Sequence, residues 1–211
     1  MKFLGSFIDK NLSWKKHLTF KSNQIVKVIS IISRLKHTVS SSILKTIYNA
    51  LILPHISYSI VSWGNLSNRE ITRLKTLQKK AVRLINRAKY NSHTDPLFQS
   101  SGILKIDDIY KIECIKLYLK NRKNLLPNYL SQQLIANNEI HTYNTRQTDD
   151  IHNRTIRSRL EEQLLNTKIS KVWNNLPNSI KELSSISRLK QYFLSLYQIN
   201  CNILNCYICN R

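Results

Sequence analysis

The chain has 211 residues, and its 33 Lys and Arg against 12 Asp and Glu give a formal net charge of +21. Hydrophobic residues make up 42%, which excludes a wholly disordered basic tail, and only 3 Gly and 4 Pro argue against an all-β sandwich and for long helices. A surface this positive repels itself unless it meets a polyanion, so nucleic acid is the expected partner. The acidic residues are few and scattered, so a metal-dependent catalytic centre is not indicated.

The N-terminal third predicts a short strand remnant within residues 1–11, followed by two apolar helical segments. Ser13 is the expected cap of a helix over residues 14–37. A second helix is expected to start near Ser41 and to be kinked or ended by Pro54, because proline lacks the N–H and clashes with the preceding turn. Polar residues interrupt this second apolar segment, so a buried, kinked helix is favoured over a membrane span, which needs about 20 apolar residues.

The clearest helix is predicted from Asn68 to about Lys89. At 100° per residue its apolar side chains share one face and its Lys and Arg side chains lie opposite, with Glu70 as the single acidic residue. A basic stripe about 27 Å long would follow several successive phosphates, whereas an ordinary solvated face usually mixes both signs. Phosphate contact is therefore favoured over a merely solvated face. The predicted nucleic-acid-binding residues are Arg69, Arg73, Lys79, Lys80, Arg83 and Arg87.

The rest of the chain predicts shorter helices and one linker. Residues 137–154 are polar and lack helical periodicity, so they are the expected linker. The overall prediction is a mainly α chain: a helical bundle with a short N-terminal strand remnant and a small helical tail. The further helices are expected at residues 96–102, 107–122, 127–134, 156–173 and 184–197.

No complete catalytic constellation is visible in the sequence. The adjacent pairs Asp107-Asp108 and Asp149-Asp150 are expected to cap a helix or to lie in solvent, because the first opens a helix and the second falls in the predicted linker. No two His residues stand at metalloprotease spacing, and there is no glycine-rich phosphate loop or Gly-x-Ser-x-Gly motif. We therefore predict no catalytic residue, no metal site and no cofactor in this chain.

Cysteine and tryptophan residues have structural interpretations. Cys201, Cys206 and Cys209 offer three thiolates where a structural zinc site needs four ligands, so a tail with reduced thiols is preferred. Cys114 lies in a helical pattern and is expected to pack. Base stacking is an alternative role for tryptophan, but a lone Trp at helical spacing is more often core, which is the expectation for Trp14, Trp63 and Trp173.

Several stretches, in the right order over most of the chain, resemble the reverse transcriptases of non-LTR (LINE, jockey-like) retrotransposons. The matching residues are Lys2-Phe3-Leu4-Gly5, Leu12-Ser13-Trp14 with His17, Pro54-His55-Ile56-Ser57-Tyr58, Trp63-Gly64, Leu77-Gln78-Lys79-Lys80-Ala81-Val82-Arg83, His93-Thr94-Asp95-Pro96-Leu97-Phe98, Leu126-Pro127, Tyr143-Asn144-Thr145-Arg146 and Trp173-Asn174-Asn175-Leu176-Pro177.

The resemblance implies an end-of-palm remnant at residues 1–13, a thumb-type helical bundle at 14–136, a linker at 137–155 and a helical tail at 156–211. In the family, palm carboxylates bind Mg²⁺ and catalyse RNA-directed DNA synthesis, and the resemblance places them upstream of this region. The expected role is thus a polymerase fragment that grips an RNA and DNA primer–template duplex inside the cell, in nucleus or cytoplasm, with a palm-bearing portion as a further candidate partner and no membrane contact.

Two alternatives remain open from the sequence. One is a stand-alone module that binds nucleic acid without sequence preference, and the other is a translated transposon relic with no function. A polymerase subunit should regain activity when it is mixed with a palm-bearing chain, whereas an independent module should need no such partner.

Overall fold

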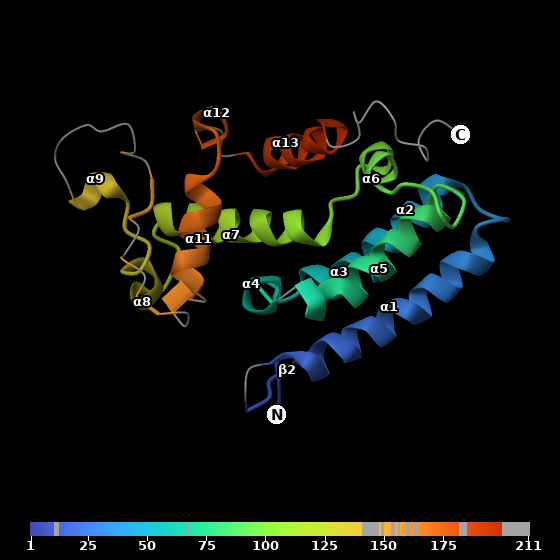
Figure 1. Ribbon diagram of the computed structural model, residues 1–211, viewed down its shortest axis with the longest axis horizontal. Coiled ribbons are helices and arrows are strands. Elements are labelled where there is room, and N and C mark those ends of the chain that lie inside the picture. The colour runs from blue at the N-terminus through green and yellow to red at the C-terminus, as the bar shows by residue number, and fades with distance from the viewer. Residues whose placement is uncertain are drawn as a thin grey trace. The chain divides into compact units, whose positions relative to one another are not determined.

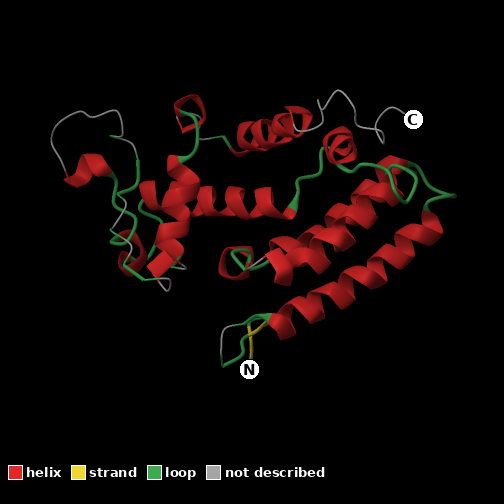
Figure 2. Ribbon diagram, viewed as in Figure 1, coloured by secondary structure: helices red, strands yellow, loops and turns green. Residues whose placement is uncertain are grey.

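The computed structural model of the chain describes residues 1–10, 13–66, 68–140, 148, 150–152, 155, 157–158, 161–162, 164–181 and 185–199. Within these ranges the chain is mainly helical with one two-stranded sheet, which confirms the prediction of a mainly α chain (Figure 1). Figure 2 shows the same view with the helices in red and the strands in yellow. None of the described helices is both long enough and apolar enough to cross a bilayer.

Contacts divide the chain into two compact units. Unit 1 comprises Met1–Ile109 with Gln191–Arg211, and unit 2 comprises Tyr110–Lys190. The domain boundaries expected from the sequence stay a prediction.

Unit 1 begins with a hairpin of β1 (Lys2–Phe3) and β2 (Ser6–Phe7), in which Phe3 lies opposite Ser6. The expected strand remnant is therefore present. The predicted helix cap is wrong: the backbone N–H and hydroxyl of Ser13 donate to Asp9, at 2.7 and 2.6 Å, and do not bond to the helix. Trp14, with φ 57°, is the residue before the helix and makes no side-chain cap.

The core of unit 1 is a set of helices whose buried faces follow the predicted periodicity. Ser40 caps the second helix by accepting from the Ile43 N–H, and Pro54 ends it, as expected, by opening a separate short helix. Among the core side chains, Ile32, Leu44 and Trp63 are fully buried. These helices are α1 (Lys15–Leu35), α2 (Ser41–Leu51), α3 (Leu53–Ser57), α4 (Ile60–Trp63), α5 (Asn68–Ile85) and α6 (Asp95–Ser101), and α1 packs along α5.

Helix α5 ends at Ile85, four residues before its predicted end. The Arg87 N–H donates to the Leu84 carbonyl and the Ala88 N–H to the Arg83 carbonyl, which is the pattern of a Schellman motif. Arg87 holds the left-handed position of that motif, with φ 53°. Glycine usually occupies this position, so the sequence carried no signal for the stop.

Unit 2 packs around Trp173, whose ring lies 4.6 Å from that of Tyr118 between centroids. Cys114 is buried in the same unit, as predicted. The helices are α7 (Ile106–Arg122), whose first four residues belong to unit 1, α8 (Asn128–Ser131), α9 (Asn137–Ile140), α11 (Leu165–Asn174), α12 (Asn178–Lys181) and α13 (Ile186–Ile199), whose last nine residues belong to unit 1.

The segment predicted as a polar linker is partly ordered by unit 2. Its first residues form α9, and Ile151, 1% exposed, pairs with Ala136 in an isolated β-bridge. The Asn174 amide donates to the Ile151 carbonyl and accepts from its N–H, both at 3.0 Å. The prediction that Asp150 lies in solvent is wrong. Its side chain is 14% exposed and pairs with Lys181 at 2.6 Å.

Some sequence predictions fall outside the described residues. These are the predictions for Asp149, for the Tyr143–Arg146 stretch and for Cys201, Cys206 and Cys209.

Candidate nucleic-acid interface

Helix α5 has one buried face and one basic face. The buried residues are Ile71, Leu74, Gln78, Ala81, Val82 and Ile85. The predicted apolar face is therefore correct in outline but centred too far toward Leu77 and Leu84, which are only half-buried. Its true centre includes a polar residue, Gln78, which the hydrophobic pattern did not select.

Gln78 is a buried polar hub of unit 1. Its Nε2 donates to the Tyr48 hydroxyl at 2.8 Å and to the Leu104 carbonyl at 2.9 Å, and its Oε1 accepts from the Ile106 N–H at 3.1 Å. Burial raises the pKa of Tyr48 to about 12, which keeps that hydroxyl protonated. The hub thus joins α5 to α2 and to the start of α7.

On the opposite face, Arg73, Lys79 and Lys80 are exposed, and we call these three side chains the basic ridge. Arg73 donates to the Asn23 side chain on α1 at 3.3 Å. Among the described residues, neither Lys79 nor Lys80 forms an ion pair. From Arg73 to Lys80 the ridge is about 10 Å long, a length that covers about three base-pair steps.

The other three predicted binding residues do not extend this ridge. Arg83 is half-buried and its Nε donates to the Ser92 carbonyl at 3.0 Å. Arg87 lies beyond the end of α5 and donates to the Val39 carbonyl at 2.9 Å, which corrects its predicted place on the stripe. The Arg69 side chain is outside the described part of the structure.

A cleft of about 540 Å³ lies along one flank of α5, bounded by residues 91–95 and by the start of α7. Two ion pairs cross it or border it: Lys75 with Asp107 at 2.8 Å, and Lys105 with Asp95 at 3.0 Å. Asp107 lies in the first turn of α7 and is half-exposed, as predicted, and it also has a tertiary partner in Lys75. The charged lining residues are Lys75, Lys79, Arg83, Asp95, Lys105 and Asp107.

Tyr197, near the end of α13, fixes the position of Lys105 within unit 1. Its hydroxyl accepts from the Lys105 N–H at 3.0 Å and donates to Asp108 at 2.6 Å, and the Lys105 Nζ lies 4.3 Å from the ring centroid. Burial, followed by the Asp108 charge, raises the pKa of Tyr197. Asp108 lies in the first turn of α7, as predicted, but it is buried and not in solvent. No local sequence signal links Asp108 to Tyr197, because they lie far apart in the chain.

The motif residues near the N-terminus have a structural role. His17 is fully buried between the rings of Trp14 and Trp63, and its Nδ1 accepts from the Phe7 N–H at 3.3 Å. Tyr58 donates to the Leu4 carbonyl. These contacts hold the hairpin to the helices. Burial, and then the charge of Lys21, lowers the pKa of His17 to about 4.

The tryptophan predictions are confirmed at two positions of three. Trp63 and Trp173 are buried core residues, and the Trp63 indole donates to the Tyr58 carbonyl at 3.1 Å. Trp14 is only half-buried and packs edge-on against His17.

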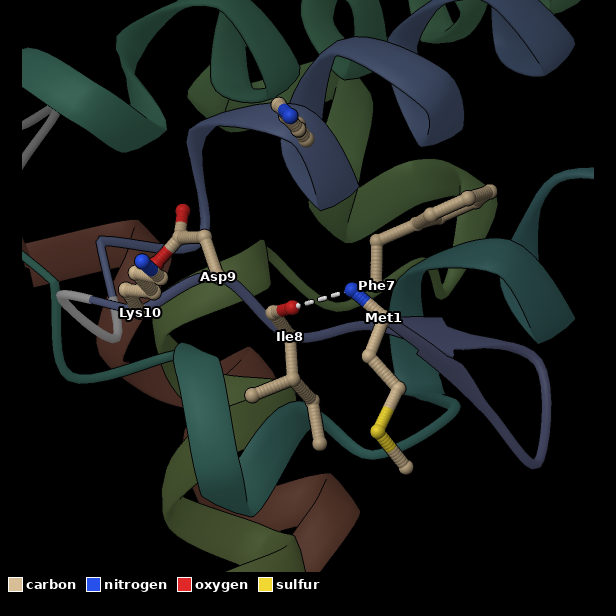
Figure 3. A pocket seen from close by; sticks show the side chains of 6 residues that line it. Met1, Phe7, Ile8, Asp9 and Lys10 are labelled. Carbon is tan, nitrogen blue, oxygen red and sulfur yellow. Dashed lines mark hydrogen bonds between the residues drawn. The ribbon is translucent and has the colours of Figure 1, made fainter.

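A second hollow, of about 600 Å³, lies at the N-terminal hairpin (Figure 3). Figure 3 shows the Met1 amino group, which donates to the Ile8 carbonyl at 2.9 Å, with Asp9 beside Lys10. Hydrogen bonds from Ser13 lower the pKa of Asp9. The lining of this hollow holds the Met1 amino group, Lys10 and Lys16 against Asp9, and the remaining lining residues are apolar.

The described residues do not fit a magnesium site. No group of three or more His, Cys, Asp or Glu among them could hold a metal ion. The carboxylates around the cleft are already bonded: Asp95 and Asp107 to lysines, and Asp108 to Tyr197. No catalytic step through a metal is therefore assigned to these residues.

Comparisons with known proteins give sequence relatives but no family model and no solved structure that matches. Over 136 residues, 63% of the chain, it is 24% identical to the RNA-directed DNA polymerase from mobile element jockey of Drosophila melanogaster. It is 32% identical over 89 residues, 40% of the chain, to the probable RNA-directed DNA polymerase from transposon X-element of the same fly.

The jockey polymerase of Drosophila funebris matches 138 residues, again 63% of the chain, at 24% identity. The matched regions span 15% of each jockey protein and 10% of the X-element protein. The resemblance seen in the motifs is confirmed: the homologues of this chain are RNA-directed DNA polymerases of non-LTR retrotransposons.

Proposed function

We propose that this chain is the thumb-type, duplex-holding part of a retrotransposon reverse transcriptase, and that it binds primer–template nucleic acid through the basic ridge of α5. The observation that carries the proposal is the ridge itself: Arg73, Lys79 and Lys80 stand exposed on a helix whose opposite face is core. Lysines and arginines on one rigid face bind backbone phosphates and displace condensed counterions.

Support also comes from the relatives, whose names describe polymerases that copy RNA into DNA. Such an enzyme must hold an RNA and DNA duplex while it extends the primer. A ridge of long basic side chains suits this task, because backbone contacts hold any sequence equally well and permit the duplex to move. The proposal therefore includes little preference among sequences.

The test is a gel-shift titration of the full chain with an RNA–DNA duplex across a series of salt concentrations. The variant Arg73→Gln/Lys80→Gln should bind the duplex roughly ten to a hundred times more weakly at low salt, with a salt slope reduced by about 1.8 if both side chains contact phosphate. The matched control is Arg188→Gln/Lys190→Gln, which removes the same charges from exposed positions on α13.

If the duplex binds at the basic ridge, the control variant should lower the affinity for the duplex by much less than the α5 variant does. Equal losses in the two variants would mean that only total charge matters. An unchanged salt slope in the α5 variant would place the phosphate contacts on another surface.

A further inference from the structure

The cleft on the flank of α5 lies where two of the sequence motifs meet. The basic stretch 77–83 supplies Gln78, Lys79 and Arg83, and the stretch 93–98 supplies the facing loop and the first residues of α6. Phe98 and Ile106, both buried, form an apolar floor. The cleft is thus a recess with a charged rim, and Lys79 belongs both to this rim and to the ridge.

Charge is unevenly compensated in this recess. Four cationic side chains line it against two carboxylates, and each carboxylate is bonded to a lysine, Asp107 to Lys75 and Asp95 to Lys105. Within the described residues, Lys79 and Arg83 have no carboxylate partner, which leaves a net charge of +2 from four cations and two anions.

Arg83 is anchored at the wall of the cleft by a backbone contact. Its Nε donates to the Ser92 carbonyl at 3.0 Å, which fixes the plane of the guanidinium at the cleft wall. The two terminal nitrogens make no hydrogen bond to the described residues, and a guanidinium edge of this kind matches two phosphate oxygens. Lys79, one helical turn earlier on α5, adds a second cation on the same flank.

We propose that this cleft binds a phosphate monoester at the end of a nucleic-acid strand. The proposal rests on the proposed function, since the strand is the one held along the ridge. A monoester carries a charge of about −1.5 to −2 at pH 7, close to the excess charge of the cleft, whereas each internal phosphodiester carries about −1. A recess of about 540 Å³ also has the size of a site for a small group such as a terminal nucleotide.

The experiment measures the affinity of the full chain for duplexes of one sequence that end in a 5′-phosphate, a 3′-phosphate or a hydroxyl. A strand-end phosphate should bind roughly tenfold more tightly than the hydroxyl end, the advantage of one well-made charged contact. Lys79→Gln should remove most of this ratio. Lys80→Gln, the neighbouring exposed lysine that does not line the cleft, should weaken all three duplexes alike and keep the ratio.

Two competitors identify the source of the phosphate. Inorganic phosphate and a mononucleotide should displace the phosphate-ended duplex only weakly, because neither makes the ridge contacts; displacement at equal concentration would assign the cleft to a free small molecule and overturn the strand-end proposal. Arg83→Lys, which keeps the charge but loses the fixed guanidinium, should retain part of the ratio.

Equal affinity for phosphate and hydroxyl ends would overturn the cleft proposal while leaving salt-dependent duplex binding intact. Loss of salt-dependent binding to every duplex would instead overturn the proposed function. A ratio lowered equally by Lys79→Gln and Lys80→Gln would also count against the cleft.

Discussion

The ion pairs of the two units lie in different settings: those of unit 1 line the cleft beside α5, and those of unit 2 hold its own segments together. Residues 1–109 carry 18 Lys and Arg against 5 Asp and Glu, and two of these carboxylates, Asp107 and Asp95, pair with lysines that line the cleft, while Lys79 and Lys80 on α5 form no ion pair with the described residues. Residues 110–190 carry 14 against 7, and three of their described acids form ion pairs within the unit. These pairs are Lys116–Glu113, Lys171–Glu162 and Lys181–Asp150.

The difference shows that the total charge of +21 does not by itself locate an interface. What matters is where cations lie beyond the reach of carboxylates, because a paired lysine must give up its partner before it can bind phosphate. By that criterion the ridge of α5 in unit 1 is a candidate for nucleic-acid contact, and the exposed Lys120, Arg122 and Lys123 of unit 2, which form no ion pair with the described residues, meet the criterion as well. The two units should also respond differently when their buried polar contacts are removed.

The largest expected effect is in unit 1, at the Gln78 hub. Gln78→Leu leaves the Tyr48 hydroxyl, the Leu104 carbonyl and the Ile106 N–H without their partner, and should lower the free energy of unfolding by about 4 kcal/mol. Urea denaturation measures this loss. Thr76→Leu, an exposed position on the same helix, is the control and should cost much less. A loss below about 1 kcal/mol would show that the hub is not a main support of unit 1.

The corresponding test in unit 2 is the buried ion pair of Lys181 and Asp150. Lys181→Met leaves the Asp150 carboxylate, which is only 14% exposed, without its ion-pair partner and should lower the free energy of unfolding by about 3 kcal/mol. Hydrogen exchange should locate the loss in residues 110–190. Asp150→Asn combined with Lys181→Met should recover much of the stability, and the exposed Lys190→Met should change little; a double variant as unstable as the single one would contradict this account.

A pH dependence specific to unit 1 is expected from His17. Its folded-state pKa of about 4 lies below the ordinary 6.5, so the unfolded chain binds more protons between these values and stability falls as the pH falls through them. By pH 5 the loss from this residue should be about 2 kcal/mol.

The measurement is urea denaturation from pH 7.5 to 4.5, as a difference between wild type and His17→Gln, since the carboxylates titrate in both. The difference should shrink toward low pH. Parallel curves would show that His17 is not the titrating group.

The smallest effect is expected at Gly102, which ends α6 in unit 1 with φ 60°. A Cβ there would meet only the Lys45 Nζ, at 3.6 Å, so Gly102→Ala fits sterically and its cost comes from the left-handed backbone. We expect thermal denaturation to show a loss of about 1 kcal/mol. A much larger loss would indicate a clash, and none would mean that the turn relaxes.

The sequence was sufficient for features that local periodicity encodes. The apolar spacing of α1 predicted Ile25, Ile29 and Ile32 as core, and Pro54 predicted the break after α2. The exposed basic face of α5 followed from the same 100° geometry, and three of its six predicted cations lie there.

Features that depend on distant partners could not be predicted in the same way. Gln78 is polar, so hydrophobic patterning assigns it no core position although its neighbours in space require it. The pairing of Lys75 with Asp107 and the bond from Tyr197 to Asp108 join residues whose proximity only the fold creates. Arg87 follows the end of α5 in the left-handed conformation that glycine normally adopts at this position. Because the residue is not glycine, the sequence did not indicate where the helix ends.

The hydrogen bonds of Tyr197 to Lys105 and Asp108 have a consequence for how this protein folds during synthesis. Unit 1 is assembled from residues up to Ile109 and from the last part of α13, so its final polar contacts require a segment that leaves the ribosome some eighty residues later. During translation, Asp108 and the Lys105 N–H therefore lack their hydrogen bonds to Tyr197 until unit 2 has been synthesised. A chain truncated after residue 109 would therefore lack the part of α13 that completes unit 1, so it would not be an independent module.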